Sequence, residues 1–129
     1  MVVLTVRATL VTLVVLWSAL LVARVDNSIT QSSNQPAAKV IRVSAERFAY
    51  TPSEITVDRG TPIEFHLTSQ DTDHGFRIIG TDVDVQIPKR RRGETVVKYT
   101  ADTAGQFIIE CSRPCGAGHT AMRATLVVK

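Results

Sequence analysis

The sequence predicts an all-β sandwich or barrel over residues 39–129, preceded by one N-terminal transmembrane helix. Short stretches that alternate apolar and polar residues follow one another from residue 39 onward. Turn-forming residues separate these stretches at intervals of about ten residues, as in antiparallel β domains. No convincing amphipathic helix pattern occurs after residue 25. Hydrophobic residues make up 44% of the 129 residues but aromatics only 5%, so we expect a core rich in Val, Ile and Leu.

Residues 1–25 form the predicted membrane anchor. Residues 8–23 contain no charge, and Arg7 stands near one end, where its long side chain can reach the interface. A cleaved signal peptide is the competing interpretation, but Leu21 occupies a position where a cleavage site needs a small residue. We therefore expect a retained single-pass anchor in the membrane. Either interpretation places the rest of the chain on the extracytoplasmic side.

A polar linker and then a series of strands are predicted after the anchor. Residues 26–38 are rich in Ser, Asn and Gln and include Pro36, a composition typical of a tether. A turn is expected at 58–61, and a proline bend at 48–55 joins two strands. We expect strands at 40–43, 55–57, 63–67, 76–79, 83–87, 95–99, 106–110 and 125–128.

Composition excludes some classes of function. The net charge of +3 is too small to indicate a nucleic-acid partner by itself, and the chain shows no internal repeat. Its two cysteines are compatible with one disulfide in an exported protein or with a metal or redox site.

The strongest chemical signal lies near the C-terminus. Cys111, Cys115, His119 and Met122 fall within twelve positions, and the chain has no other cysteine and no other methionine besides Met1. Two thiolates, an imidazole and a thioether suit copper better than magnesium or calcium. Copper with such ligands usually transfers electrons, so we expect an electron-transfer site.

Two further histidines differ in their expected roles. His74 follows a polar turn and precedes Gly75, which allows close approach of another backbone. We expect His74 to be the distant ligand of the C-terminal cluster. His66 shares the polar face of its strand with Glu64 and Thr68, so we expect it to be exposed to solvent.

Several chemistries remain open for the cysteine loop from its residues alone. A mononuclear blue-copper site would use Cys115, His74, His119 and Met122, and would leave Cys111 as a surplus thiol. If both cysteines bind, their thiolates can bridge two copper ions. A disulfide, a zinc site or a thiol redox site are less favoured. Zinc would leave the methionine unused, and Pro114 and Gly116 argue against the helix that an activated cysteine needs.

The pattern C-x3-C-x3-H-x2-M at the end of a β domain, with D-x-x-H-G-F upstream, resembles the CuA domain of cytochrome c oxidase subunit II. The resemblance is to the short, single-anchor form of that subunit and covers residues 40–129. It implies a cupredoxin-like Greek-key fold and a binuclear copper centre bridged by Cys111 and Cys115. His74 and Met122 would complete one copper, and His119 and the carbonyl of Arg113 the other. Asp71 would orient the ligand loop.

The resemblance also implies a function. The chain would be an oxidoreductase subunit that accepts electrons from a cytochrome c or a cupredoxin and passes them to the haem-bearing subunit I of a terminal oxidase. A free-standing, membrane-tethered CuA carrier and a copper-delivery module remain as alternatives. The chain departs from the family in carrying Arg113 where Glu is frequent, in lacking a tryptophan-rich segment and second helix, and in its basic run Lys89–Arg92.

Overall fold

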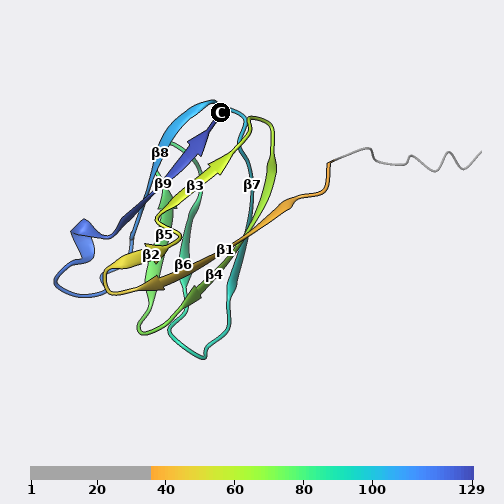
Figure 1. Cartoon of the computed structure of the whole chain (residues 1–129). Coiled ribbons are helices and arrows are strands. Elements are labelled where there is room, and N and C mark those ends of the chain that lie inside the picture. The colour runs from red at the N-terminus through yellow and green to blue at the C-terminus, as the bar shows by residue number, and fades with distance from the viewer. Residues whose placement is uncertain (1–35) are drawn as a thin grey trace, which may run out of the picture. The chain divides into compact units, whose positions relative to one another are not determined.

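The structure is a computed structural model that describes residues 36–129. In this part of the chain, two β-sheets pack face to face (Figure 1). That part contains nine strands and one short 3-10 helix, η1. Their bounds are β1 Lys39–Glu46, β2 Ala49–Thr51, β3 Glu54–Val57, β4 Pro62–Ser69, β5 His74–Ile78, β6 Asp84–Ile87, β7 Thr95–Thr100, β8 Gly105–Glu110, η1 His119–Ala121 and β9 Arg123–Val128.

Both sheets are mixed, which corrects the expectation of an antiparallel sandwich. One sheet has the order β2-β1-β4-β7 and the other the order β3-β9-β8-β5-β6. Strands β1 and β4 pair in parallel, with Val43 opposite Leu67, and β3 and β9 also pair in parallel. Alternation of polar and apolar residues reports which face is buried but not the direction of the neighbouring strand, so the sequence could not reveal these parallel pairs.

Aromatic rings join the two sheets in the core. Phe65 on β4 lies 5.3 Å from Phe76 on β5, measured between ring centroids, and the Tyr50 ring on β2 meets Phe76 edge-on at 6.0 Å. All three residues are buried. Their contacts fix the β5 strand, which begins at His74, against the opposite sheet. The core therefore holds one predicted metal ligand in a rigid position.

The strands agree with the sequence-based prediction to within a few residues, except for β2, which was expected to be part of a proline bend. The all-β, cupredoxin-like class is confirmed. The predicted transmembrane helix of residues 1–25 and nearly all of the predicted linker, residues 26–38, lie outside the described residues. Between residues 36 and 129, no helix is both long enough and apolar enough to cross a membrane.

Candidate metal centre

The loop between β8 and β9 carries four of the predicted ligand side chains. Strand β8 runs directly into Cys111, and β9 begins just after Met122. The amide of Cys111 donates to the carbonyl of Met122 at 3.2 Å, so the two ends of the loop are tied together. Within the loop, the Met122 amide donates to the carbonyl of His119. These bonds fold twelve residues into one compact loop at the end of a rigid strand pair.

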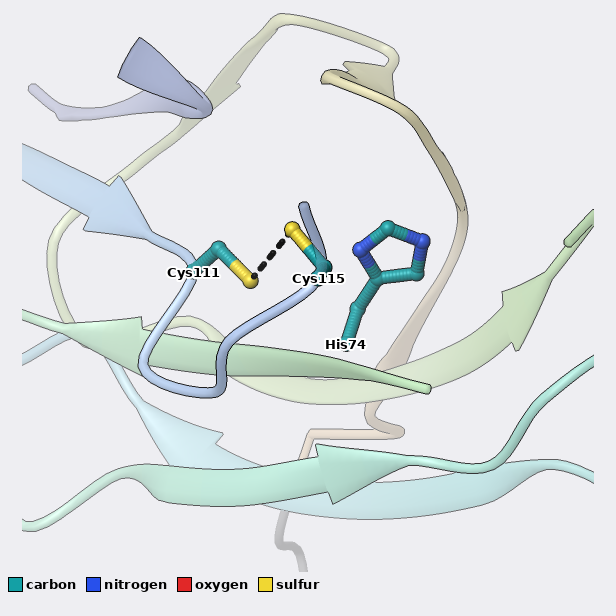
Figure 2. A group of neighbouring side chains, drawn as sticks. All are labelled: His74, Cys111 and Cys115. Atoms are coloured by element: carbon teal, nitrogen blue, oxygen red, sulfur yellow. Dashed lines mark hydrogen bonds between the residues drawn. The ribbon is translucent and has the colours of Figure 1, made fainter. Parts of the chain in front are cut away.

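The two cysteines lie side by side beneath the surface (Figure 2). Cys111 and Cys115 are both buried and both free, and their sulfur atoms are 3.6 Å apart. A disulfide requires about 2.05 Å between the sulfurs, so the structure holds two thiols. Two sulfurs at this spacing provide a pair of soft donors that face a common space.

His74 completes a three-residue group with the cysteines. Its side chain is fully buried, and one ligand atom from each of His74, Cys111 and Cys115 lies within 4.8 Å of the others. The Nε2 atom of His74 is 2.7 Å from Asp71 Oδ1, whereas Nδ1 is buried without a hydrogen-bond partner. A buried ring nitrogen without a partner is costly unless a ligand satisfies it, and Figure 2 shows the imidazole beside Cys115.

The remaining predicted ligands converge on the same sulfurs. The Nδ1 atom of His119 and the Sδ atom of Met122 each lie 3.9 Å from the Cys115 sulfur. The carbonyl oxygen of Arg113 lies 3.1 Å from the Cys111 sulfur. Met122 is fully buried, and His119 is partly exposed. The fold thus brings all six predicted residues together around two sulfur atoms.

Gly75 explains how the loop comes so close to β5. Its amide donates to the Cys111 sulfur at 3.3 Å. A Cβ at this position would lie 2.7 Å from the amide nitrogen of Arg113 and closer still to Ser112. The hydroxyl of Tyr50 donates to the Gly75 carbonyl at 2.5 Å, which holds the same residue from its other side. The close backbone approach predicted for Gly75 is therefore confirmed.

Two neighbours of the loop were not among the predicted site residues. Arg47 donates from Nε to the carbonyl of Cys115 at 2.7 Å, and its amide donates to Asp71 Oδ2 at 3.0 Å. The ring of Phe48 covers the loop at Gly118, where a Cβ would overlap the ring. Arg47 is 68 residues from Cys115 in the chain, so only the fold reveals this contact.

Burial and neighbouring groups shift the pKa values of two ionisable groups in the centre. Burial raises the pKa of the Cys115 thiol to about 11, and the neighbouring Cys111 adds to the shift. Burial also disfavours the charged form of Asp71, but hydrogen bonds from His74 and from backbone amides outweigh it and lower the Asp71 pKa to about 2. A metal ion must therefore displace the proton of Cys115, while Asp71 is already charged and fixes Nε2 of His74 as the protonated nitrogen.

His66 lies apart from this centre. Its ring nitrogens contact Glu64 at 2.8 Å and Glu94 at 3.3 Å, on the polar face of β4. His66 lies on the polar face as predicted, but it is not exposed as expected: its side chain is only 17% exposed, because the two carboxylates cover part of the ring.

The donor set fits copper. Two thiols, an unpartnered imidazole nitrogen, a second imidazole and a buried thioether form a soft ligand group held by a β scaffold. A zinc site would leave the Met122 thioether without a role. Fold and donor set together define a domain of the cupredoxin class.

Comparison with known proteins identifies the family. No family model matches the chain. Two curated proteins named cytochrome c oxidase subunit 2, both from Thermus thermophilus, are 39% identical over 95 residues, which is 73% of this chain. The match spans 68% of one relative and 55% of the other. The chain belongs to the cytochrome c oxidase subunit 2 family, and it is accordingly a subunit of an oxidoreductase.

Solved structures support the same fold. The chain is similar to one from a haem-copper terminal oxidase dimer, with a TM-score of 0.64 and 20% identity over 97% of both chains. The periplasmic domain of cytochrome oxidase subunit II from Bradyrhizobium japonicum gives a TM-score of 0.64 at 19% identity, covering 74% of this chain and 87% of that one. Auracyanin A, a blue copper protein from Chloroflexus aurantiacus, gives a TM-score of 0.58 at 16% identity. The match covers 72% of this chain and 100% of that one.

Proposed function

We propose that this domain holds a binuclear copper centre that relays single electrons. The observation that carries the proposal is the pair of free, buried cysteine sulfurs 3.6 Å apart, since a mononuclear blue-copper site needs only one thiolate. Bound copper would supply a site that takes up and releases one electron at a time. Cys111 and Cys115 would hold the two ions together through their thiolates.

The other predicted ligands are divided between the two ions. His74, through Nδ1, and Met122 are proposed for one copper, and His119 and the carbonyl of Arg113 for the other. The buried position of His74 and Met122 supports exclusion of water from their side of the centre. The partly exposed His119 offers a short route between the centre and the protein surface.

The scaffold supports electron transfer because it allows little movement. The Cys111–Met122 backbone bond, the Gly75 amide and the Arg47 side chain each fix the loop at a different point. A site whose ligands are held in place by such contacts changes little when its charge changes. In this proposal the residues of the centre hold and orient copper, and none of them forms or breaks a bond with a substrate.

We further propose the direction of the relay and its location. The chain would be tethered to the membrane by residues 1–25 with the copper domain on the extracytoplasmic side. It would take electrons from a cytochrome c or a cupredoxin and pass them to the haem-bearing subunit of a terminal oxidase. Membership of the cytochrome c oxidase subunit 2 family supports this assignment.

Electron paramagnetic resonance of the copper-loaded chain tests the centre. We expect two copper ions per chain and a seven-line hyperfine pattern, because one unpaired electron would be shared equally by two copper nuclei. A four-line pattern with one copper per chain would contradict the binuclear proposal. Purification of the native protein from mild detergent tests the partner: haem should co-purify with it, and a haem-free preparation would favour a free-standing carrier.

A further inference from the structure

A loop of four consecutive cations lies next to the metal centre. We call Lys89, Arg90, Arg91 and Arg92 the basic loop; it joins β6 to β7. The Lys89 amide donates to Asp73 Oδ1 at 2.8 Å, and the Arg90 amide donates to the carbonyl of Asp71 at 3.2 Å. Asp71 and Asp73 precede His74, so the basic loop is tied to the segment that presents this ligand. The sequence alone gave no indication of this position.

The charges of the basic loop are free to act on a partner. All four side chains are exposed, and none of the ion pairs among residues 36–129 involves them. Three carboxylates close to the ligand segments already have partners within the domain. Asp71 is bonded to His74, and Asp73 accepts the Lys89 amide. Asp84 accepts from Ser112 and Arg113.

Further cations surround the ligand loop on its other sides. A surface hollow of about 230 Å³ opens beside Cys111 and His119, and Arg77 and Arg123 lie in its lining. Arg77 is neutralised by Glu110, whereas Arg123 is exposed and belongs to none of the ion pairs of residues 36–129. Arg47 adds a cation at the Cys115 carbonyl. Exposed cations outside the ion pairs of residues 36–129 therefore lie on more than one side of the ligand loop.

Small apolar residues are exposed on the ligand loop itself. Pro114, Ala117 and Ala121 of the ligand loop are exposed, and so is Phe48, which packs over the loop. An apolar centre with a charged rim is the usual anatomy of a protein–protein interface. A lipid headgroup layer would need the cations but not this apolar centre at the metal loop.

We propose that the basic loop recruits an electron-donor protein whose docking face is acidic. This inference rests on the proposed function and names the chemistry of the donor. Opposite charges on two docking faces raise the rate of encounter and orient the partners, and salt weakens the effect. A donor with a basic docking face would be repelled from this loop.

Small redox probes measure the field at the metal without a known donor. The full chain, copper-loaded in nanodiscs of neutral phosphatidylcholine, is oxidised from its reduced form by hexacyanoferrate(III), which gains the electron that the centre loses. It is reduced from its oxidised form by hexaammineruthenium(II), which supplies one electron. We expect added salt to slow the reaction with the anion and to accelerate the reaction with the cation.

Two charge-matched double variants assign the effect to the basic loop. Arg90→Gln/Arg92→Gln removes two charges of the basic loop. Arg59→Gln/Lys129→Gln removes two at the opposite end of β9, where the Arg59 amide bonds to the Lys129 carbonyl. At low salt, the loop variant should slow oxidation by the anion roughly threefold or more, and the control should change it far less. Equal effects of the two variants would overturn the proposal.

A second readout needs no metal. A fluorescein-labelled decaglutamate peptide should bind the full chain more weakly, by roughly threefold or more, in the loop variant than in the control variant. Vesicles containing phosphatidylglycerol provide the competing outcome. If the loop variant loses vesicle binding while its probe rates and peptide binding stay at the control level, the loop serves lipid and the proposal fails. Absence of the seven-line spectrum in the unsubstituted protein would instead contradict the binuclear centre, whatever the salt dependence of the probe rates.

Discussion

Asp71 holds His74 in a single tautomer: its carboxylate lies 2.7 Å from Nε2, and the opposite ring nitrogen, Nδ1, is buried with no hydrogen-bond partner. The same carboxylate accepts the Arg47 amide through its second oxygen. Asp71 therefore links three separate features: the proposed ligand His74, the arginine at the Cys115 carbonyl and, through its own backbone carbonyl, the basic loop.

Asp71→Asn should weaken copper binding by about 10- to 100-fold, because an amide does not fix the His74 ring as a charged carboxylate does. Competition with a copper chelator measures the loss. Asp82→Asn is the matched control, since Asp82 is exposed and belongs to none of the ion pairs of residues 36–129. Equal copper affinities of the Asp71→Asn variant and the unsubstituted protein would show that the contact does not position the ligand.

Cys111→Ser should abolish the binuclear spectrum and reduce the copper content to one ion per chain or less, because a hydroxyl cannot replace a bridging thiolate. Metal analysis and visible absorption of the purified variant measure both effects. An unchanged binuclear spectrum with two copper ions in this variant would exclude Cys111 as a bridge.

Met122→Leu should keep most of the copper and shift the reduction potential, because the thioether is a weak ligand in sites of this type. Met122 is fully buried, and leucine has a similar volume, so the loss in unfolding free energy should stay below about 1.5 kcal/mol. Redox titration and chemical unfolding separate the two effects. Complete loss of copper would mean that Met122 is a principal ligand.

Gly118→Ala should destabilise the domain by about 1–3 kcal/mol, because the added Cβ would lie 2.8 Å from Cε2 of Phe48 and closer to other ring carbons. Adding Phe48→Ala should recover part of that loss, which a double-mutant cycle of unfolding free energies measures. Gly75→Ala is the comparison: it meets the backbone of Ser112 and Arg113, so no side-chain truncation should rescue it. Strict additivity of the Gly118 and Phe48 changes would disprove the contact.

His66→Gln should lower stability in acid and have little effect in mild alkali. The hydrogen bond to Glu64, with a contribution from Glu94, raises the His66 pKa above 6.5 despite partial desolvation. A raised pKa in the folded state adds stability that is fully present below the ordinary pKa and is lost as the pH rises through the raised value. Urea unfolding at about pH 6 and pH 8 should therefore show the larger difference at pH 6. Copper content should not change, and a fall would place His66 in the metal centre.

The sequence predicted the class of the fold and most strands because their alternating residues report directly on burial. β4 is the clearest case, since Ile63, Phe65 and Leu67 are buried while Glu64 and His66 are partly exposed. It could not predict β2, a strand of three residues in which only Tyr50 is buried, because so short a segment shows no period. The parallel pairs were also missed, because partner direction depends on the path of the chain.

For the candidate metal centre, spacing in the chain predicted the residues of the β8–β9 loop, and the polar turn before Gly75 predicted His74; the structure brings these residues together. The surroundings were less predictable. Arg47, Tyr50 and Asp84 reach the centre from strands or loops far away in the chain, and nothing in their local sequence indicates it. Contacts made by a side chain with a distant backbone atom, such as the Arg47–Cys115 bond, leave no local pattern.

The attachment of the basic loop has an evolutionary consequence. Lys89 and Arg90 are joined to the His74 segment through their backbone amides, which every residue except proline possesses. Their side chains can therefore be exchanged without altering the bonds that hold the loop beside the metal. A lineage could reverse the charge of this loop without changing any proposed copper ligand, so partner choice and electron-transfer chemistry can evolve independently.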